Sequence, residues 1–204
     1  MDAAEDRQAR TALQTAAWWR QEVENGLEVY ESSWHGNSKW PSRSFHYVVG
    51  RRSPFRFLTG KRGGNPGIPA GSEGMELVWA VYFGTYATNG GNMLQGGAIS
   101  SVFDVGTAQL GSIMFGRENG GSFGVTKTLT VAFKRPGPLK KALRLSMRAT
   151  DVSRVDMGQM DAVAELSDGD TIIAEMSCEL VDPVRRQRWR SQQKQSEAGG
   201  KSRL

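Results

Sequence analysis

The sequence predicts an α+β fold in which an antiparallel sheet wraps around one long, buried helix. Two observations predict it. Residues 97–115 have apolar side chains in nearly every direction around a helical axis, which is typical of a helix buried on most sides. Residues 125–180 then alternate β-rich segments with turns, and packing a sheet against a helix is one of the few ways to bury the apolar faces of both.

Turn-forming residues separate the predicted strands. The strands cover residues 76–83, 125–133, 143–152, 159–166 and 171–180. Pro136-Gly137-Pro138 follows the second strand, and the last two strands are separated by an Asp-Gly turn at Asp168-Gly169. Such a turn between two β-rich segments is typical of a hairpin, so the last pair is predicted to be antiparallel.

The chain divides into three predicted segments. Residues 1–74 form an N-terminal extension, in which apolar residues at three- and four-residue spacing predict one or two amphipathic helices and the Gly/Pro-rich residues 60–74 predict a loop. Residues 75–182 form the main domain. Residues 183–204 carry seven basic side chains against one acidic side chain, which predicts a solvated, disordered, basic tail.

Composition excludes several classes of protein. A chain of 204 residues is long enough for one well-buried core, and no segment approaches the roughly 20 apolar residues that a membrane span needs. Three acidic residues among the first six argue against a secretory or organelle-targeting peptide. Cys178 is the single cysteine, and its β-rich surroundings favour a small packed residue over a reactive thiol. We expect a cytoplasmic protein, with import into an organelle left open.

Two motifs resemble those of a known family. Gln95-Gly96-Gly97, followed after six residues by Asp104, resembles the signature of hotdog-fold acyl-CoA thioesterases of the phenylacetate-pathway and thioesterase-superfamily-member type. In that family the first residue of the signature is His. Residues 131–136 resemble the family's strand that ends in an aromatic residue, basic residues and Pro. The resemblance implies the hotdog fold, with the predicted buried helix at its centre.

The resemblance, which extends over residues 76–182, also implies a division of roles. In the family, the amide of the first glycine polarises the thioester carbonyl, a role that falls on Gly96, with Gly97 beside it against the substrate. A helix N-terminus suits this role because its unpaired N–H groups and partial positive charge face the developing oxyanion. The family's general base or nucleophile corresponds to Asp104, a carboxylate that is costly within an apolar helix unless it has a partner or a function.

Gln95 and Asn89 are further candidates for the site. Gln95 replaces the family's His and forms hydrogen bonds, but it cannot carry a proton near neutral pH. Asn89 lies six residues earlier, where many family members have an Asn that orients the carbonyl or the attacking water. An ordinary turn residue is an equally good interpretation of Asn89.

Substrate-binding candidates lie on the predicted strand 125–133 and just after it. Thr126 lies ten residues before the Pro that closes this strand, where the family places a Ser or Thr, and Thr128 is predicted to face the same side. Lys134 and Arg135 are candidate partners for the phosphates of coenzyme A. No dinucleotide-binding motif and no metal-ligand cluster is found in the sequence, and hydrolysis needs only water, so we expect no cofactor.

Helix geometry predicts that the site is shared between two subunits. Gly96 and Asp104 are eight residues apart, so they lie roughly 12 Å apart along one helix and cannot both contact the same carbonyl carbon. A site that uses both residues must combine two chains across a two-fold axis. We therefore expect a homodimer, with a dimer of dimers left open, and no specific nucleic-acid partner.

The predicted function is hydrolysis of acyl-CoA thioesters to free acid and coenzyme A, an activity of lipid and fatty acid metabolism. A hotdog hydratase or dehydratase is a weaker interpretation, because the catalytic His motif of those enzymes is not found. A non-catalytic acyl-CoA-binding or scaffold protein is the main alternative. Gln95 favours this alternative and Asp104 argues against it.

Overall fold

The protein is represented by a computed structural model that describes residues 3–29, 55–62, 75–116 and 124–200. Within these ranges, seven strands form one antiparallel sheet in the order β1-β2-β3-β5-β6-β7-β4. The strands are β1 Glu28–Val29, β2 Phe55–Arg62, β3 Glu76–Phe83, β4 Val125–Phe133, β5 Ala142–Asp151, β6 Gln159–Asp168 and β7 Thr171–Val181. The helices are α1 Ala3–Thr15, α2 Ala17–Glu24, α3 Gly96–Met114 and α4 Pro183–Gly200, with short 3₁₀ turns η2 Thr85–Ala87 and η4 Val155–Met157.

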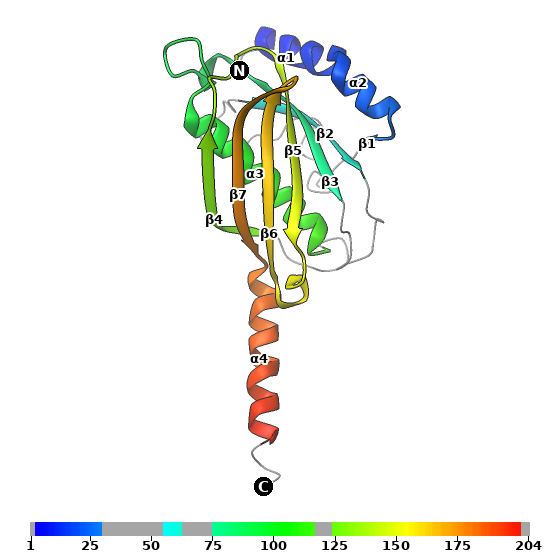
Figure 1. Ribbon diagram of the computed structural model, residues 1–204, viewed down its shortest axis with the longest axis vertical. Helices are drawn as coiled ribbons and strands as arrows, with labels where there is room; N and C mark the ends of the chain where they lie inside the picture. The colour runs from blue at the N-terminus through cyan, green and yellow to red at the C-terminus, as the bar shows by residue number, and fades with distance from the viewer. Residues whose placement is uncertain (1–2, 30–54, 63–74, 117–123, 201–204) are drawn as a thin grey trace.

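Helix α3 is the centre of the main core. Strands β4, β7, β6 and β5 pass in front of it in Figure 1, and twelve of its 19 residues are buried. The helix follows β3 in the chain, β4 then takes the far edge of the sheet, and β5, β6 and β7 fill the space between. This order of a long helix and an antiparallel sheet is the hotdog fold, so the predicted α+β hotdog architecture is confirmed.

Residues next to α3 in the sequence determine where the helix begins and ends. The helix begins after Gln95, whose side-chain Oε1 accepts a hydrogen bond of 2.8 Å from the amide of Ala98 and so caps the first turn. It ends at Met114, with Phe115 as its C-cap, because Gly116 adopts a left-handed conformation with φ of 65° that glycine reaches without strain. The helix therefore begins and ends one residue earlier than the predicted range of 97–115.

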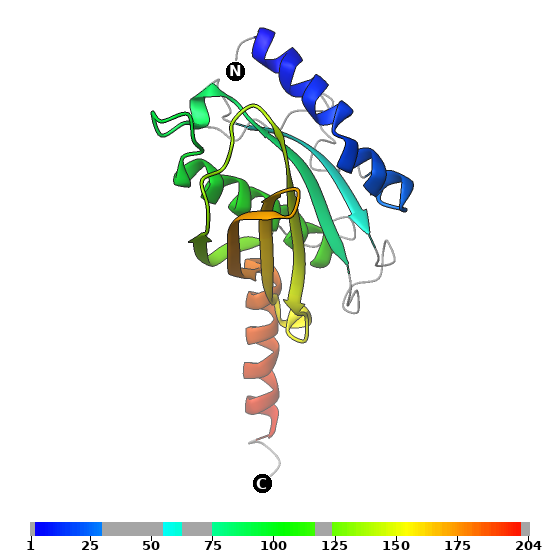
Figure 2. The same ribbon diagram turned by 45° about the horizontal axis from the view of Figure 1, so that its top comes forward.

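Helices α1 and α2 cover the opposite face of the sheet (Figure 2). Their apolar side chains bury the outward residues of β3, so β3 is buried on both faces, which accounts for its continuous apolar sequence. This second core contains Ala9, Leu13, Trp19, Leu27, Val78, Ala80, Tyr82 and Ala142. The prediction of one or two N-terminal helices is confirmed, with two helices in the described residues.

Strand β2 corrects the predicted boundary at residue 75. It pairs with β3 along its whole length, from Phe55 opposite Phe83 to Arg62 opposite Glu76, so the sheet extends into the segment predicted as helix and loop. Its sequence combines a glycine with basic residues and lacks a clean alternation of apolar and polar side chains. Pairing with β3 therefore decides its conformation. Residues 60–62 of the predicted loop belong to β2, and residues 63–74 lie outside the described part of the chain.

The prediction of a disordered tail is wrong for Pro183–Gly200, which form α4. Asp182 caps this helix, because its Oδ1 accepts a hydrogen bond of 2.9 Å from the amide of Arg185. Pro183 occupies the first helical position, which suits its fixed φ angle, and the Arg and Gln residues that follow are good helix formers. The charge of the segment predicts a solvated tail, but it does not indicate the cap at Asp182 that begins the helix.

Arg185 attaches α4 to the main core. Its guanidinium donates to the backbone carbonyl of Phe115 at the end of α3 (3.0 Å) and to that of Val155 in η4 (3.2 Å). Arg185→Ala removes both bonds and leaves the Phe115 carbonyl without a donor among the described residues, while the Val155 carbonyl keeps the amide of Gly158, so the free energy of unfolding should fall by about 1–3 kcal/mol in urea titrations. Arg188→Ala, at an exposed position of the same helix, should change it by no more than about 0.5 kcal/mol. Equal effects of the two substitutions would contradict this attachment.

Candidate active site

A pocket of about 440 Å³ opens at the N-terminal end of α3. The turn after β3, the start of α3 and the segment that follows β4 all contribute to its lining. Its lining residues are Asn89, Met93, Leu94, Gly96, Ile99, Phe133, Lys134, Arg135, Pro136 and Gly137. Four residues predicted for the site, Asn89, Gly96, Lys134 and Arg135, are thus brought together, although up to 46 positions separate them in the sequence.

The start of α3 presents backbone amides at this pocket. Gln95 Oε1 binds the amide of Ala98, while the amides of Gly96 and Gly97 precede the first donors of the helical hydrogen-bond ladder. A Cβ atom on Gly96 would lie 3.1 Å from Cζ of Phe133, so glycine allows this close approach and any side chain here would make the aromatic ring shift. The amides and the helix dipole give this end of the pocket a partial positive charge.

Asn89 shapes the turn that leads into α3. Its side-chain Oδ1 accepts a hydrogen bond of 3.0 Å from the amide of Gly91, and its own amide donates to the carbonyl of Met93 at 3.1 Å. The turn interpretation of Asn89 therefore holds, and Asn89 also lines the pocket. Its role toward a substrate stays a prediction.

Lys134 and Arg135 are held at the pocket by their backbone. Both amides donate to the carbonyl of Ile173, at 2.9 and 3.1 Å, which fixes the chain leaving β4 against β7. The ammonium of Lys134 lies 2.8 Å from the carboxylate of Glu175, and both side chains are nearly half exposed. Exposed ion pairs of this kind contribute little free energy, so Lys134 is able to exchange its carboxylate partner for a phosphate.

Asp104 does not line this pocket. It is half-buried in the middle of α3, roughly 12 Å along the helix from Gly96, and it lies near Cys178 on β7. Burial raises the pKa of the Cys178 thiol to about 11; a hydrogen bond with Thr107 lowers it in part, and the Asp104 carboxylate raises it further. The thiol stays protonated near neutral pH, in agreement with the prediction of a packed cysteine.

Strand β4 corrects one prediction about the threonines. A bulge at Lys127 makes Thr126 pair with Leu180 and Thr128 with the neighbouring Glu179, so the two threonines face opposite sides of the sheet. Thr126 faces the α3 side, and its Oγ1 is buried without a hydrogen-bond partner among the described residues. Thr128 is exposed and accepts a hydrogen bond of 3.2 Å from the amide of Glu179. The strict alternation assumed from the sequence fails at the bulge.

Phe133 is the aromatic residue of the lining, and the sequence analysis did not single it out for the site. It is the last residue of β4, and its ring lies directly beside Gly96. The side chain is 55% exposed, which is unusual for a large aromatic residue. Its position directly before Lys134, in the motif that ends the strand, is the sequence feature that could have placed Phe133 at the site.

The described residues include no candidate metal site. Within the described ranges, no group of three or more His, Cys, Asp or Glu side chains is placed to hold a metal ion. His35 and His46 lie outside those ranges. The described helices also include none that combines the length and the apolar character needed to cross a membrane.

No family model and no curated protein matches the chain. Solved structures of thioesterase-superfamily proteins are similar to it. The phenylacetic acid degradation-related protein from Ralstonia eutropha is 24% identical, with 52% of this chain and 75% of that chain covered and a TM-score of 0.46.

Two further structures cover more of the chain. Thioesterase superfamily member 2 from zebrafish is 15% identical, with 61% of this chain and 80% of that chain covered and a TM-score of 0.46. A Streptococcus mutans protein whose structure was solved bound to acetyl-CoA is 12% identical, with 67% and 94% covered and the same TM-score of 0.46. At these identities the likeness concerns the fold, and the function has to be argued from the site itself.

Thr126 does not line the pocket at the start of α3, so its buried hydroxyl provides a separate test of the predicted site. Thr126→Val keeps the shape of the side chain and removes a hydroxyl that has no described partner, so the free energy of unfolding should stay within about 1 kcal/mol. If the hydroxyl serves the thioester hydrolysis that the sequence predicts, turnover on acyl-CoA should fall at least tenfold. Thr128→Val is the matched control, which should keep turnover while losing about 0.5–1.5 kcal/mol with its bond to Glu179. Full turnover of Thr126→Val would remove this residue from the site.

Proposed function

We propose that the protein hydrolyses acyl-coenzyme A thioesters to a free acid and coenzyme A. The observation that carries the proposal is the pocket at the start of α3, which combines the Gly96 amide with Lys134 and Arg135. A thioester oxygen that becomes negative during the reaction fits the partial positive charge of the helix N-terminus. The basic side chains at the rim fit the phosphates of coenzyme A.

Asp104 is the group that we propose for the chemical step. As a general base, its carboxylate takes a proton from water while the water oxygen forms a bond to the thioester carbon. The carbon–sulfur bond then breaks, and the proton passes to the sulfur of coenzyme A. As a nucleophile, the carboxylate would instead form an acyl intermediate that water hydrolyses. In both cases the Gly96 amide stabilises the same oxyanion.

The edge of the sheet supports a shared site. β4 pairs with β7 on one side and is the last strand of the described sheet, and it exposes two large apolar side chains, Val125 at 48% and Phe133 at 55%. Such an edge is a template for pairing with another strand. Antiparallel pairing with β4 of a second copy across a two-fold axis would cover it.

This pairing has a consequence for the two helices. Because the two-fold axis reverses the strand direction and keeps both α3 helices on the same side of the joined sheet, the helices run in opposite directions. The start of one helix then points toward the middle of the other. We propose that each site combines Gly96 of one subunit with the partner subunit's Asp104, in a homodimer.

Gln95 favours a second candidate function. Its Oε1 caps α3 through Ala98, so the residue in the position of the family's His has a structural partner instead of a free proton-carrying ring. A protein that binds acyl-CoA without hydrolysing it would have the same pocket. Release of free thiol from acyl-CoA distinguishes the two functions, because only the enzyme produces it. Saturable acyl-CoA binding without thiol release would support the non-catalytic protein.

Asp104→Asn tests the proposed base. The substitution keeps the size of the side chain, so thermal unfolding should be unchanged within a few degrees, while turnover should fall by about two to four powers of ten. Asp156→Asn, at an exposed position in η4, is the matched control and should keep full turnover. Near-wild-type thiol release by Asp104→Asn would exclude Asp104 from the mechanism.

A further inference from the structure

Helix α4 projects away from the rest of the molecule. Figures 1 and 2 show it extending from the end of β7, with no other element of the described chain along its length after the first turn. It carries five basic side chains between Pro183 and Gln195 and no acidic one in that range. The net charge of the whole chain is also +5, so the rest of the sequence has as many acidic as basic residues.

Three of the basic residues form one stripe. Arg186, Arg190 and Lys194 are spaced four residues apart, which places them on the same side of the helix over a length of roughly 12 Å. They line a groove of about 490 Å³ together with Val181, Pro183, Gln187 and Ser191. The Gln187 side-chain amide beside the cations offers a further hydrogen bond to an anion. None of the three cations forms an ion pair with another described residue.

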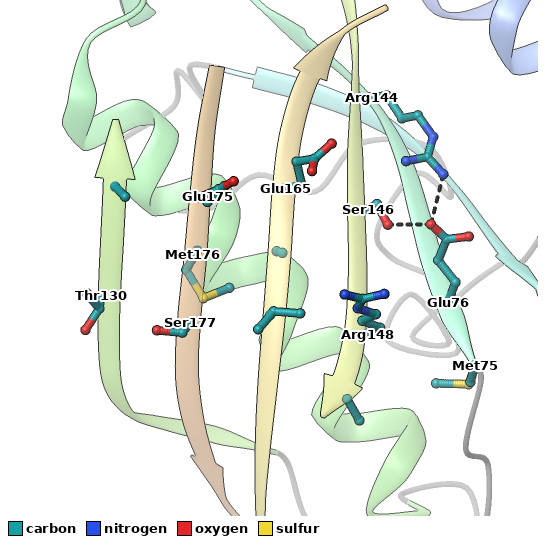
Figure 3. Close-up of a pocket in the computed structure, with 14 residues that line it drawn as sticks. Met75, Glu76, Thr130, Arg144, Ser146, Arg148, Glu165, Glu175, Met176 and Ser177 are labelled. Carbon is teal, nitrogen blue, oxygen red and sulfur yellow. Dashed lines mark hydrogen bonds and ion pairs between the residues drawn. The ribbon is translucent and has the colours of Figure 1, made fainter. Parts of the chain in front are cut away.

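The larger hollow on the outer face of the sheet differs in this respect. It measures about 770 Å³ and holds both signs of charge. Figure 3 shows Arg144 and Ser146 both directed at Glu76, and the guanidinium of Arg144 lies 2.9 Å from that carboxylate. Glu165 and Glu175 lie across the same face. Because its cations are matched by carboxylates, this hollow has no comparable excess of positive charge.

We propose that α4 binds the phosphate backbone of a nucleic acid, without regard to base sequence. Successive phosphates of one strand rise by about 3.4 Å along a duplex, so a stripe of about 12 Å spans three to four of them. Two of the three cations are Arg, whose planar fork binds phosphate oxygens in pairs. No base-reading motif is present in the sequence, so the contacts position the backbone and specify no sequence.

Two other anionic partners fit the helix less well. A helix that lies on a membrane needs an apolar face, but Val184 and Trp189 are the large apolar residues of α4 up to Gln195, and a spacing of five places them on different sides. The phosphates of coenzyme A in the subunit's own pocket are remote, because Arg185 contacts the C-terminal end of α3 and the pocket lies at its N-terminal end, roughly 28 Å away.

The test is binding of a short fluorescent DNA duplex by the full-length protein, measured by anisotropy over a series of salt concentrations. Three phosphate contacts predict that the logarithm of the binding constant falls with the logarithm of salt with a slope of about 2.7. The triple variant Arg186→Gln/Arg190→Gln/Lys194→Gln should weaken binding at least tenfold and reduce the slope to near zero. Circular dichroism should confirm that this variant keeps its helix content.

A control variant with the same change in charge separates a local site from general attraction. Arg7→Gln/Arg10→Gln/Arg20→Gln removes three exposed charges from α1 and α2 and should keep most of the affinity. Equal losses in both variants, or no binding of the duplex at low salt, would overturn the proposal. Binding to phosphatidylserine vesicles without binding to DNA would also overturn it. Thiol release from acyl-CoA should be unchanged in the α4 variant, because the two proposals concern separate sites.

Discussion

Helix α3 is packed against the sheet along most of its length, with twelve of its 19 residues buried, and both parts of the candidate site depend on this packing. The helix is fixed so closely that a Cβ on Gly111 would lie 3.1 Å from the backbone of Gly124. Its N-terminus is therefore held at the pocket beside Phe133, and its middle holds Asp104 near β7. A rigid helix of this kind does not bend to bring Gly96 and Asp104 together.

This rigidity connects the fold to the proposed mechanism. In the proposed mechanism, one chain would offer an oxyanion site without a base and a base without an oxyanion site, and the edge strand β4 packs against the helix that carries both. A second copy paired along β4 would supply the missing half and cover the exposed Val125 and Phe133. The preorganised geometry then depends on the sheet and the two helices, and loops are needed only to line the pocket.

The sequence predicted the elements whose side chains follow a clear period. β3 and β4 have the predicted bounds, and α3 is shifted by one residue, because burial on one or all sides leaves a regular pattern. β2 was missed because its partner β3, and not its own pattern, decides its conformation. The bulge at Lys127 and the cap of α4 by Asp182 are single-residue events that periodicity does not record. The pocket forms between the start of α3 and the end of β4, which are distant in the sequence, so no local pattern predicts it.

The most direct test of the shared site is the activity of a mixed dimer. One subunit carries Asp104→Asn and the other carries Gly96→Val, whose side chain would meet the ring of Phe133 and crowd the oxyanion position. If each site takes one residue from each subunit, one site of the doubly tagged dimer has both defects and the other has neither. Thiol release should then be about half that of the wild-type dimer. A folded, stable mixed dimer with only background activity would show that Gly96 and Asp104 do not act across the interface.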